Sequence, residues 1–233
     1  MSYKNPYVEQ CLEGSFSMLR CLPDNEKEQL DQNHNYRVVK KGEAVFRPGE
    51  RPNGLLCLAQ GKVKIFKEGI GGRDQIIRMV KPQGILGYSA FIRGTSYSCS
   101  AMAIEESVIC IFDSETFLKV LRRNSDLSIM MMKMMAVDLS FSFERTVSLT
   151  QKHIRGRLAE SLIVLRDTYG LENDGKTIKA YVSREDLAAL SNMTTSNAIR
   201  TLSMFATESV IAIDGKKISI VDSVRLEKIS SLG

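Results

Sequence analysis

The distribution of glycine places the most constraint on the fold of this 233-residue chain. Ten of the 16 glycines lie between Gly42 and Gly94, where they separate short runs rich in β-branched and aromatic residues at intervals of about ten residues. The runs are 55–58, 62–66, 75–80 and 107–112. Tight turns between strands often need a positive φ, which glycine adopts without strain. Residues 36–112 are therefore predicted to form a small antiparallel β-barrel or β-roll.

The pattern becomes helical after residue 112. Ser114 is the predicted cap of a short helix through residue 122. Ser125 or Asp126 is the predicted cap of a much longer helix that ends near residue 150. The apolar residues of the long helix cover more than one side, so it must be buried on two sides. One stripe has alternating spacings of three and four, which suits a partner helix; its residues are Met132, Met135, Leu139, Ser142, Thr146 and Leu149. This spacing predicts a homodimer. A central helix of a monomer and a methionine-lined ligand groove are the alternatives.

The C-terminal segment has the spacing of a helix-turn-helix followed by a hairpin. Ser183 is placed to cap one helix, Asn192 to break it, and Thr194 to cap a second helix through about residue 205. Asp214-Gly215 is a strong hairpin signal, with Lys216 and Lys217 at the tip of the predicted wing. The predicted domains are 1–123 (sensor), 124–150 (dimerisation helix) and 151–233 (winged helix-turn-helix).

Composition excludes several other classes of protein. The 32 Lys and Arg against 27 Asp and Glu give a net charge of only +5, too small to indicate a general polyanion binder. No apolar stretch reaches the roughly 18 residues of a membrane span. The five cysteines are an odd number at scattered positions, and the N-terminal residues lack a secretory apolar core, so we expect reduced thiols in a cytoplasm. No enzyme motif is present.

The order of these parts resembles the CRP/FNR family of bacterial transcription regulators. The motifs that carry the resemblance are Gly61-Lys-Val-Lys-Ile, Lys81-Pro-Gln-Gly-Ile-Leu-Gly87, Gly156-Arg-Leu-Ala159 and the ungapped run 183–221. The resemblance implies an α+β fold with an N-terminal antiparallel β-roll of the cyclic-nucleotide-binding type, a long dimerisation helix and a C-terminal winged helix-turn-helix. It also implies a cytoplasmic, homodimeric regulator that binds double-stranded DNA and has RNA polymerase as a partner.

The resemblance places the DNA-reading residues on the second helix of the motif. The catabolite activator presents Arg-Glu-x-x-x-Arg, whereas this chain keeps only the last arginine, as Arg200, so a different half-site is expected. Arg200 is suited to a guanine, and the other polar side chains to base edges or phosphates. The full predicted set is Ser183, Arg184, Thr194, Thr195, Ser196, Asn197, Arg200 and Lys216. A simple capping role is the alternative for Thr194.

The predicted effector pocket departs from the pattern of cyclic-nucleotide binders. Those proteins use a Glu after a turn glycine and an Arg-Ser pair, whereas this chain has Tyr88 after Gly87, and Tyr97 followed by Ser98. A phosphodiester needs a cation or a nest of N-H donors, which argues against cyclic AMP. Ser142 and Phe143 are the long-helix residues that would meet an adenine.

The effector therefore stays open at this point. Cys11 and Cys21 do not reproduce the close cysteines that hold an iron-sulfur cluster in other members. A heme is possible, because one His, Cys or Met can ligate iron. His34 is expected on the surface in the polar stretch 31–35, and His153 at a hinge as a helix cap or phosphate contact. Alternative functions are a sensor subunit that docks a partner protein, a regulator that senses gas or redox state through heme and, third, an enzyme.

Overall fold

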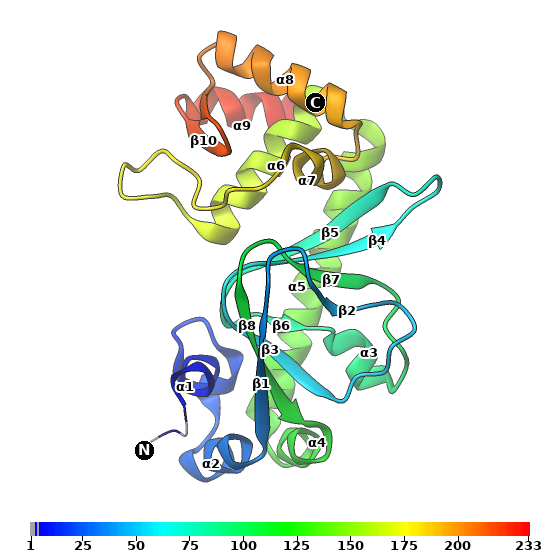
Figure 1. Cartoon of the computed structure of the whole chain (residues 1–233), viewed down its shortest axis with the longest axis vertical. Helices are drawn as coiled ribbons and strands as arrows, with labels where there is room; N and C mark the ends of the chain where they lie inside the picture. The colour runs from blue at the N-terminus through cyan, green and yellow to red at the C-terminus, as the bar shows by residue number, and fades with distance from the viewer. Residues whose placement is uncertain (1–2, 4) are drawn as a thin grey trace. The chain divides into compact units, whose positions relative to one another are not determined.

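The computed structural model describes residue 3 and residues 5–233. The chain forms two compact units, one from Met1–Lys67 with Arg78–Leu139 and the other from Glu68–Ile77 with Ser140–Gly233. The first unit contains the strand-rich part of the chain, and the second contains the C-terminal helices and a small hairpin (Figure 1). Each unit is described separately below.

The strand-rich part consists of two four-stranded sheets. The first has the order β1-β8-β3-β6, with β1 at His34–Val39, β8 at Ser107–Asp113, β3 at Gly54–Gln60 and β6 at Ile85–Leu86. The second has the order β2-β7-β4-β5, with β2 at Ala44–Phe46, β7 at Ser100–Ala103, β4 at Val63–Glu68 and β5 at Asp74–Val80. The pairings within the first sheet are antiparallel. The predicted strand runs correspond to β3, β4, β5 and β8, and the predicted antiparallel roll is confirmed.

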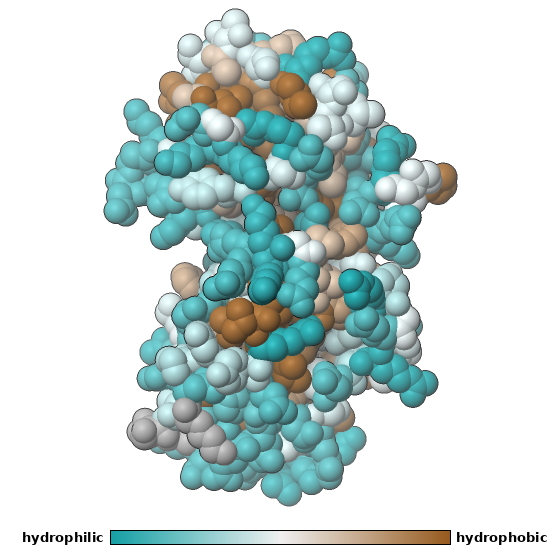
Figure 2. Space-filling model, in the orientation of Figure 1, coloured by the Kyte–Doolittle hydropathy of each residue, from teal (hydrophilic) through white to brown (hydrophobic). Residues whose placement is uncertain are grey.

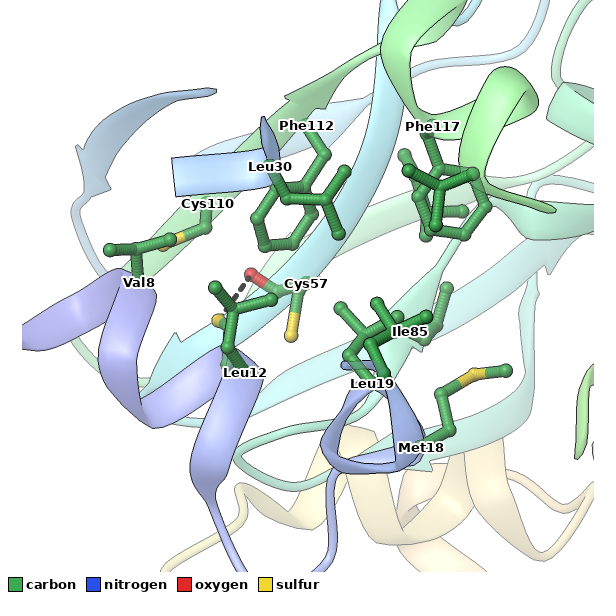
Figure 3. Close-up of a cluster of buried hydrophobic side chains, with 14 of the residues drawn as sticks. Val8, Leu12, Met18, Leu19, Leu30, Cys57, Ile85, Cys110, Phe112 and Phe117 are labelled. Atoms are coloured by element: carbon green, nitrogen blue, oxygen red, sulfur yellow. Dashed lines mark hydrogen bonds between the residues drawn. The ribbon is translucent and has the colours of Figure 1, made fainter. Parts of the chain in front are cut away.

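Short helices pack against the roll and close its core. They are α1 (Pro6–Glu13), the 3-10 helix η1 (Met18–Cys21), α2 (Asp24–Gln32), α3 (Tyr88–Arg93) and α4 (Ser114–Arg123). Figure 3 shows Leu12 of α1, Leu30 of α2 and Phe117 of α4 beside Phe112 of β8, and all four side chains are fully buried. One hydrophobic cluster of the first unit therefore lies between the first sheet and these helices, and a second one is formed by buried residues of both sheets, among them Leu58 of β3 and Val63 of β4.

Three buried thiols lie in the same core. Cys57 of β3 and Cys110 of β8 are paired across the sheet (Figure 3). The Cys11 thiol donates to the Cys57 carbonyl oxygen, 3.9 Å away. A hydrogen bond with Cys11, together with burial, raises the pKa of the Cys110 thiol. All five cysteines are free thiols. The thiols of this cluster therefore act as small apolar side chains.

Two predicted helix caps are displaced by one residue. Helix α4 is capped by Asp113 and not Ser114, because a side-chain oxygen of Asp113 accepts a hydrogen bond from the Thr116 amide at 2.9 Å. Similarly, Asn124 rather than Ser125 or Asp126 accepts from the Leu127 amide at 2.8 Å. In both cases the capping oxygen bonds the amide three residues further on, and the earlier residue is the one with that reach.

The prediction that His34 is a surface side chain is wrong. Only 5% of its side chain is exposed. Its Nδ1 lies 2.7 Å from the Asp31 carbonyl oxygen, and its Nε2 lies 2.9 Å from Nδ2 of Asn5. Local polarity of the sequence is misleading here because the polar neighbours bond the ring instead of exposing it to solvent.

Helix α5 (Ser125–Gln151) is the longest element and is apolar on two sides. Leu127 and Met131 are buried in the core of the first unit. The opposite side of the helix carries apolar residues at spacings of three and four that we name the exposed strip: Ile129, Met132, Ala136, Leu139, Phe143 and Val147. Met132, Leu139 and Phe143 are 56%, 54% and 64% exposed. Met135 and Leu149 of the predicted dimer stripe are only half-buried, whereas Met132, Leu139 and Thr146 are exposed.

The second unit is a helical module with a two-stranded sheet. Its elements beyond α5 are α6 (Ile154–Tyr169), α7 (Arg184–Leu190), α8 (Thr195–Thr207), β9 (Ile211–Asp214), β10 (Lys217–Ile220) and α9 (Ser223–Leu232). Leu158, Leu162, Leu187, Leu202 and Phe205 are buried and form its apolar interior. No helix in the described part of the chain is long and apolar enough to cross a membrane.

Candidate nucleic-acid interface and effector pocket

Helices α7 and α8 form the predicted helix-turn-helix, and each is capped as the sequence indicates. The Ser183 hydroxyl accepts a hydrogen bond from the Asp186 amide at 3.0 Å, and the Thr194 hydroxyl accepts one from the Asn197 amide at 3.2 Å. Between them Asn192 has a φ of 50°, a left-handed conformation that asparagine tolerates better than most residues. The helix cap is thus the observed role of Thr194, and the turn fixes the start of α8.

The outer face of α8 carries the polar residues that were predicted to read DNA. Ser196 and Arg200 are exposed, and Thr195 and Asn197 are half-buried. The Arg200 guanidinium donates a hydrogen bond to Oδ1 of Asn197 at 2.7 Å. Asn197 therefore orients Arg200, and it keeps its amide N-H groups for another acceptor.

Two exposed apolar residues of the same face were not identified from the sequence. Ile199 is 48% exposed and Met204 is 43% exposed, and Figure 2 shows hydrophobic surface over α8 and α9 among hydrophilic residues. The available signal was that Ile199 lies three residues after Ser196 and Met204 four residues after Arg200, since residues at these spacings are neighbours on a helix face. An exposed isoleucine beside an arginine is suited to the methyl group of a thymine.

The wing is formed by β9 and β10, with Gly215 and Lys216 at its turn. Asp214 pairs with Lys217 across the hairpin, and Gly215 has a positive φ of 56°. Lys216 is exposed. Arg184, at the start of α7, donates from its guanidinium to the Gly215 carbonyl at 2.8 Å. The Arg184 side chain therefore braces the wing against the helix-turn-helix, a role that the sequence did not suggest.

A second charged contact lies beyond the C-terminal end of α8. Arg155 of α6 bonds both carboxylate oxygens of Glu208, at 2.8 and 2.9 Å, and Arg225 of α9 bonds the same carboxylate at 3.0 Å. The hydrogen bonds from Arg155 lower the pKa of Glu208. His153 occupies the N-cap position of α6, and its side chain makes no capping hydrogen bond. These arginines are thus partly neutralised within the protein.

In the first unit, Tyr97 of the predicted effector pocket is buried against Phe46. Its ring stacks on that of Phe46 with centroids 3.9 Å apart, and the side chain is 6% exposed. A Cβ atom at Gly87 would lie only 2.5 Å from the Tyr97 ring, so glycine is needed for this packing as well as for its φ of 64°. Burial raises the pKa of Tyr97 to about 12. The structure therefore brings Gly87 and Tyr97 together, but around an aromatic stack.

Tyr88 is also engaged within the protein. Its hydroxyl donates to the Asp138 carboxylate of α5, and the Arg78 guanidinium donates to the same oxygen at 2.8 Å. Burial is the main cause that raises the pKa of Tyr88. The other three residues of the predicted pocket are exposed. Ser98 belongs to the first unit, and Ser142 and Phe143 belong to the second. Among the described residues, no group of three His, Cys, Asp or Glu side chains is arranged to hold a metal ion.

Comparison with known families agrees with this arrangement. Residues 36–124 match the cyclic nucleotide-binding domain, and residues 156–229 match the Crp-like helix-turn-helix domain. The first match covers most of the β-roll through α4, and the second covers α6 through most of α9. Both matches fall on the elements that carry the candidate sites.

Similar proteins and structures span almost the whole chain. The fumarate and nitrate reduction regulatory protein of Vibrio cholerae is 23% identical over 228 residues, 95% of this chain and 90% of that protein. Electron transport regulator A of Shewanella oneidensis is 24% identical over 218 residues, 93% of this chain and 87% of that protein. The structure of FixK2 from Bradyrhizobium japonicum has a TM-score of 0.76 at 20% identity, covering 84% of this chain and 96% of that one. A CRP/FNR-family regulator of Thermus thermophilus has a TM-score of 0.70 at 20% identity, covering 84% of this chain and 98% of that one.

Proposed function

Because this chain belongs to the CRP/FNR family of transcription regulators, we propose that it acts in the cytoplasm as a homodimer that binds specific double-stranded DNA. Its β-roll responds to an effector other than cyclic AMP, and RNA polymerase is its partner at promoters. DNA binding, the homodimer and the nature of the effector each have support in the chain, whereas RNA polymerase and the cytoplasm are proposed from the family resemblance alone.

The single observation that carries DNA binding is the oriented arginine on an exposed, polar face of α8. Arg200 is held by Asn197 at 2.7 Å, with Ser196 exposed beside it and Lys216 exposed at the wing tip. An arginine can bond O6 and N7 of a guanine in the major groove, while the wing lysine bonds the phosphate backbone. The proposed DNA-binding set is Ser183, Arg184, Thr194, Thr195, Ser196, Asn197, Arg200 and Lys216, to which we add Ile199.

The exposed strip of α5 supports the homodimer. It extends from Ile129 to Val147, which corresponds to about 27 Å of helix. A monomer rarely leaves such a continuous apolar surface in water, and a second copy of the same helix offers the same 3-4 spacing. A dimer of this kind presents two α8 helices to half-sites one helical turn, or about 34 Å, apart.

The aromatic stack at Gly87 supports an effector other than cyclic AMP. Tyr97 stands at the position of the arginine that pairs with the phosphate in cyclic-nucleotide binders, and its ring is buried on Phe46. Tyr88 stands at the position of the glutamate, and its hydroxyl is bonded to Asp138. At these two positions the chain thus has neither the cation nor the carboxylate that cyclic-nucleotide binders place there.

A selection experiment tests the proposal. The full-length protein is incubated with a randomised pool of DNA duplexes, retained duplexes are amplified and sequenced, and binding of the enriched sequence is measured at several salt concentrations. We expect a palindrome with affinity at least about a thousandfold above that of random duplex, and a loss of affinity as salt rises. Equal retention of all sequences would contradict specific regulation and favour a protein-docking role for the C-terminal module.

A further inference from the structure

Helix α5 inserts one arginine into the interior of the second unit. Arg145 is only 6% exposed. Its Nη2 donates to the carbonyl oxygen of Leu190, the last residue of α7. The last carbonyls of a helix have no partner within the helix and carry the negative end of its dipole. A cation that caps them from another helix therefore holds the two elements together.

The counter-charge for Arg145 comes from α6. The Arg145 Nη1 lies 3.7 Å from Oε1 of Glu160 and makes no hydrogen bond of its own. The other Glu160 oxygen accepts from the Ser148 hydroxyl and from the Lys152 ammonium, the latter at 3.1 Å. The Glu160 carboxylate thus faces three side chains: Arg145 and Ser148 from the C-terminal part of α5, and Lys152, which directly follows α5.

We propose that Arg145 is a positioning residue for DNA recognition, which fixes the C-terminal end of α7, and hence the turn into α8, to the end of the dimerisation helix. The inference rests on the proposed function, because positioning matters only if α8 reads DNA. The turn begins at Ser191, directly after Leu190. Two half-sites at a fixed separation can be read together only if each α8 is held at a defined place relative to α5.

Because the Arg145–Glu160 pair is largely buried, the contact can be removed with little loss of stability if both charges are replaced together. A buried ion pair is often no more stabilising than apolar side chains of similar volume, while loss of one partner alone leaves an uncompensated charge. A hydrogen bond to a helix end has direction, which an apolar replacement does not reproduce. The double substitution Arg145→Met with Glu160→Met therefore removes the anchor without leaving a buried charge.

A matched control exists at the same end of this turn. Ser191 donates from its hydroxyl to that of Ser161 on α6 at 2.8 Å, and both residues are buried. Ser161→Ala breaks this contact and leaves the Arg145 contact with Leu190 in place. It is therefore expected to reduce stability without changing how α7 is fixed to α5.

The test compares full-length variants on duplexes that the wild type selects from a randomised pool, with one base pair inserted or deleted between the half-sites. For the wild type we expect the altered spacing to weaken binding at least about tenfold, because one base pair rotates a half-site by roughly 34°. The double variant should bind the original palindrome about tenfold more weakly and discriminate spacing less than about threefold. Ser161→Ala should keep the wild-type spacing preference. A double variant with wild-type affinity and spacing preference would overturn the proposal.

Two additions complete the test. Amide hydrogen exchange probes the anchor without DNA, and a conservative variant replaces the double variant if that one does not fold. Faster exchange of residues 191–197 in the double variant, with unchanged exchange in α1 and β8, is expected from loss of the anchor. If the amides of 191–197 were as well protected from exchange as in the wild type, the Arg145 anchor would be contradicted. This outcome is informative even if the wild type bound no duplex and the proposed function had failed. If the double variant does not fold, the spacing preference of Arg145→Lys is measured in its place. The lysine ammonium is a point charge without the planar fork of the guanidinium, so it does not reproduce the directed contact with Leu190 beside Glu160. An unchanged spacing preference in this variant therefore also counts against the anchor.

Discussion

The guanidinium of Arg200 and the side-chain carbonyl of Asn197 lie 2.7 Å apart, one turn from each other on α8. A long arginine side chain loses rotamer freedom when it binds, and a neighbour that holds it beforehand reduces this cost. If α8 reads DNA as we propose, Asn197 therefore contributes to recognition even where it touches no base. This pair defines which substitutions on α8 should alter sequence preference and which should only weaken binding.

Arg200→Ala is expected to cost about 1 to 3 kcal/mol on the selected operator and to relax preference at one base pair, because a bidentate contact with guanine is lost. Lys216→Ala at the wing is the control, since it removes a phosphate contact. It should weaken all sequences about equally and lower the salt slope by about 1. Fluorescence anisotropy at several salt concentrations separates the two effects. If neither substitution changes affinity, α8 does not contact DNA.

Asn197→Ala should weaken specific binding less than Arg200→Ala, by about 0.5 to 1.5 kcal/mol, which is the usual net contribution of one hydrogen bond. The preferred base at the Arg200 position should stay the same, because the arginine remains present. Selection with the variant protein checks this directly. A new base preference in that position would show that Asn197 reads the base itself.

Ile199→Ser should reduce preference for a thymine beside the guanine that Arg200 reads. The isoleucine is 48% exposed on the recognition face, and apolar contact with the thymine methyl group is lost in the variant. Replacing thymine by uracil in the duplex, which removes the methyl group, should weaken the wild type but not the variant. Equal effects of uracil on both proteins would place Ile199 away from the bases.

Leu139→Asp should convert the proposed dimer to a monomer, because it places a carboxylate in the middle of the exposed strip of α5. A charge at the core of a helix pair must lose its hydration without gaining a partner. Sedimentation velocity at micromolar concentration measures the change. Glu144→Ala, an exposed residue of the same helix outside the strip, is the control and should stay dimeric. A wild-type chain that sediments as a monomer would refute the assignment of this strip.

The pKa of Asp174 provides a test of local structure in the second unit. The Thr177 hydroxyl and the amides of Thr177 and Lys176 donate to its carboxylate and lower its pKa from 3.8 to about 2. Because the folded pKa lies below the ordinary value, the contribution to stability is complete above about pH 4 and is lost as pH falls from about 4 to 2. Thr177→Val should raise this pKa towards its ordinary value, whereas Thr177→Ser should keep it low. Carbon-13 NMR titration of the carboxylate follows both.

The overall architecture followed from the sequence because turns and helix starts depend on local chemistry. The glycine-marked turns, the caps at Ser183 and Thr194 and the Asp214-Gly215 hairpin each need a particular residue type at a particular place. The side-chain partners were less accessible. The family resemblance put Tyr97 where cyclic-nucleotide binders have an arginine, but it did not indicate that the ring stacks on Phe46, about fifty residues earlier, since such contacts depend on the completed fold.

The same limit applies to the charged residues. Arg184 was assigned to DNA on its position, yet its guanidinium bonds the wing at Gly215, and Arg145 received no role at all. A sequence pattern separates polar from apolar faces, but it does not show that an arginine turns inward to cap a distant helix end. Likewise, Phe143 was assigned to the effector pocket, although its spacing from Leu139 also places it on the exposed strip of α5.

The stack of Tyr97 on Phe46 has a kinetic consequence for any small molecule that enters this part of the β-roll. A molecule that takes the place of the ring binds only after the ring swings out, and the binding-competent form is then a minor species whose fraction scales the observed affinity. At high ligand concentration the observed association rate would level off at the rate at which the tyrosine departs. Replacing Tyr97 by alanine would remove this ceiling, so that association rises in proportion to concentration.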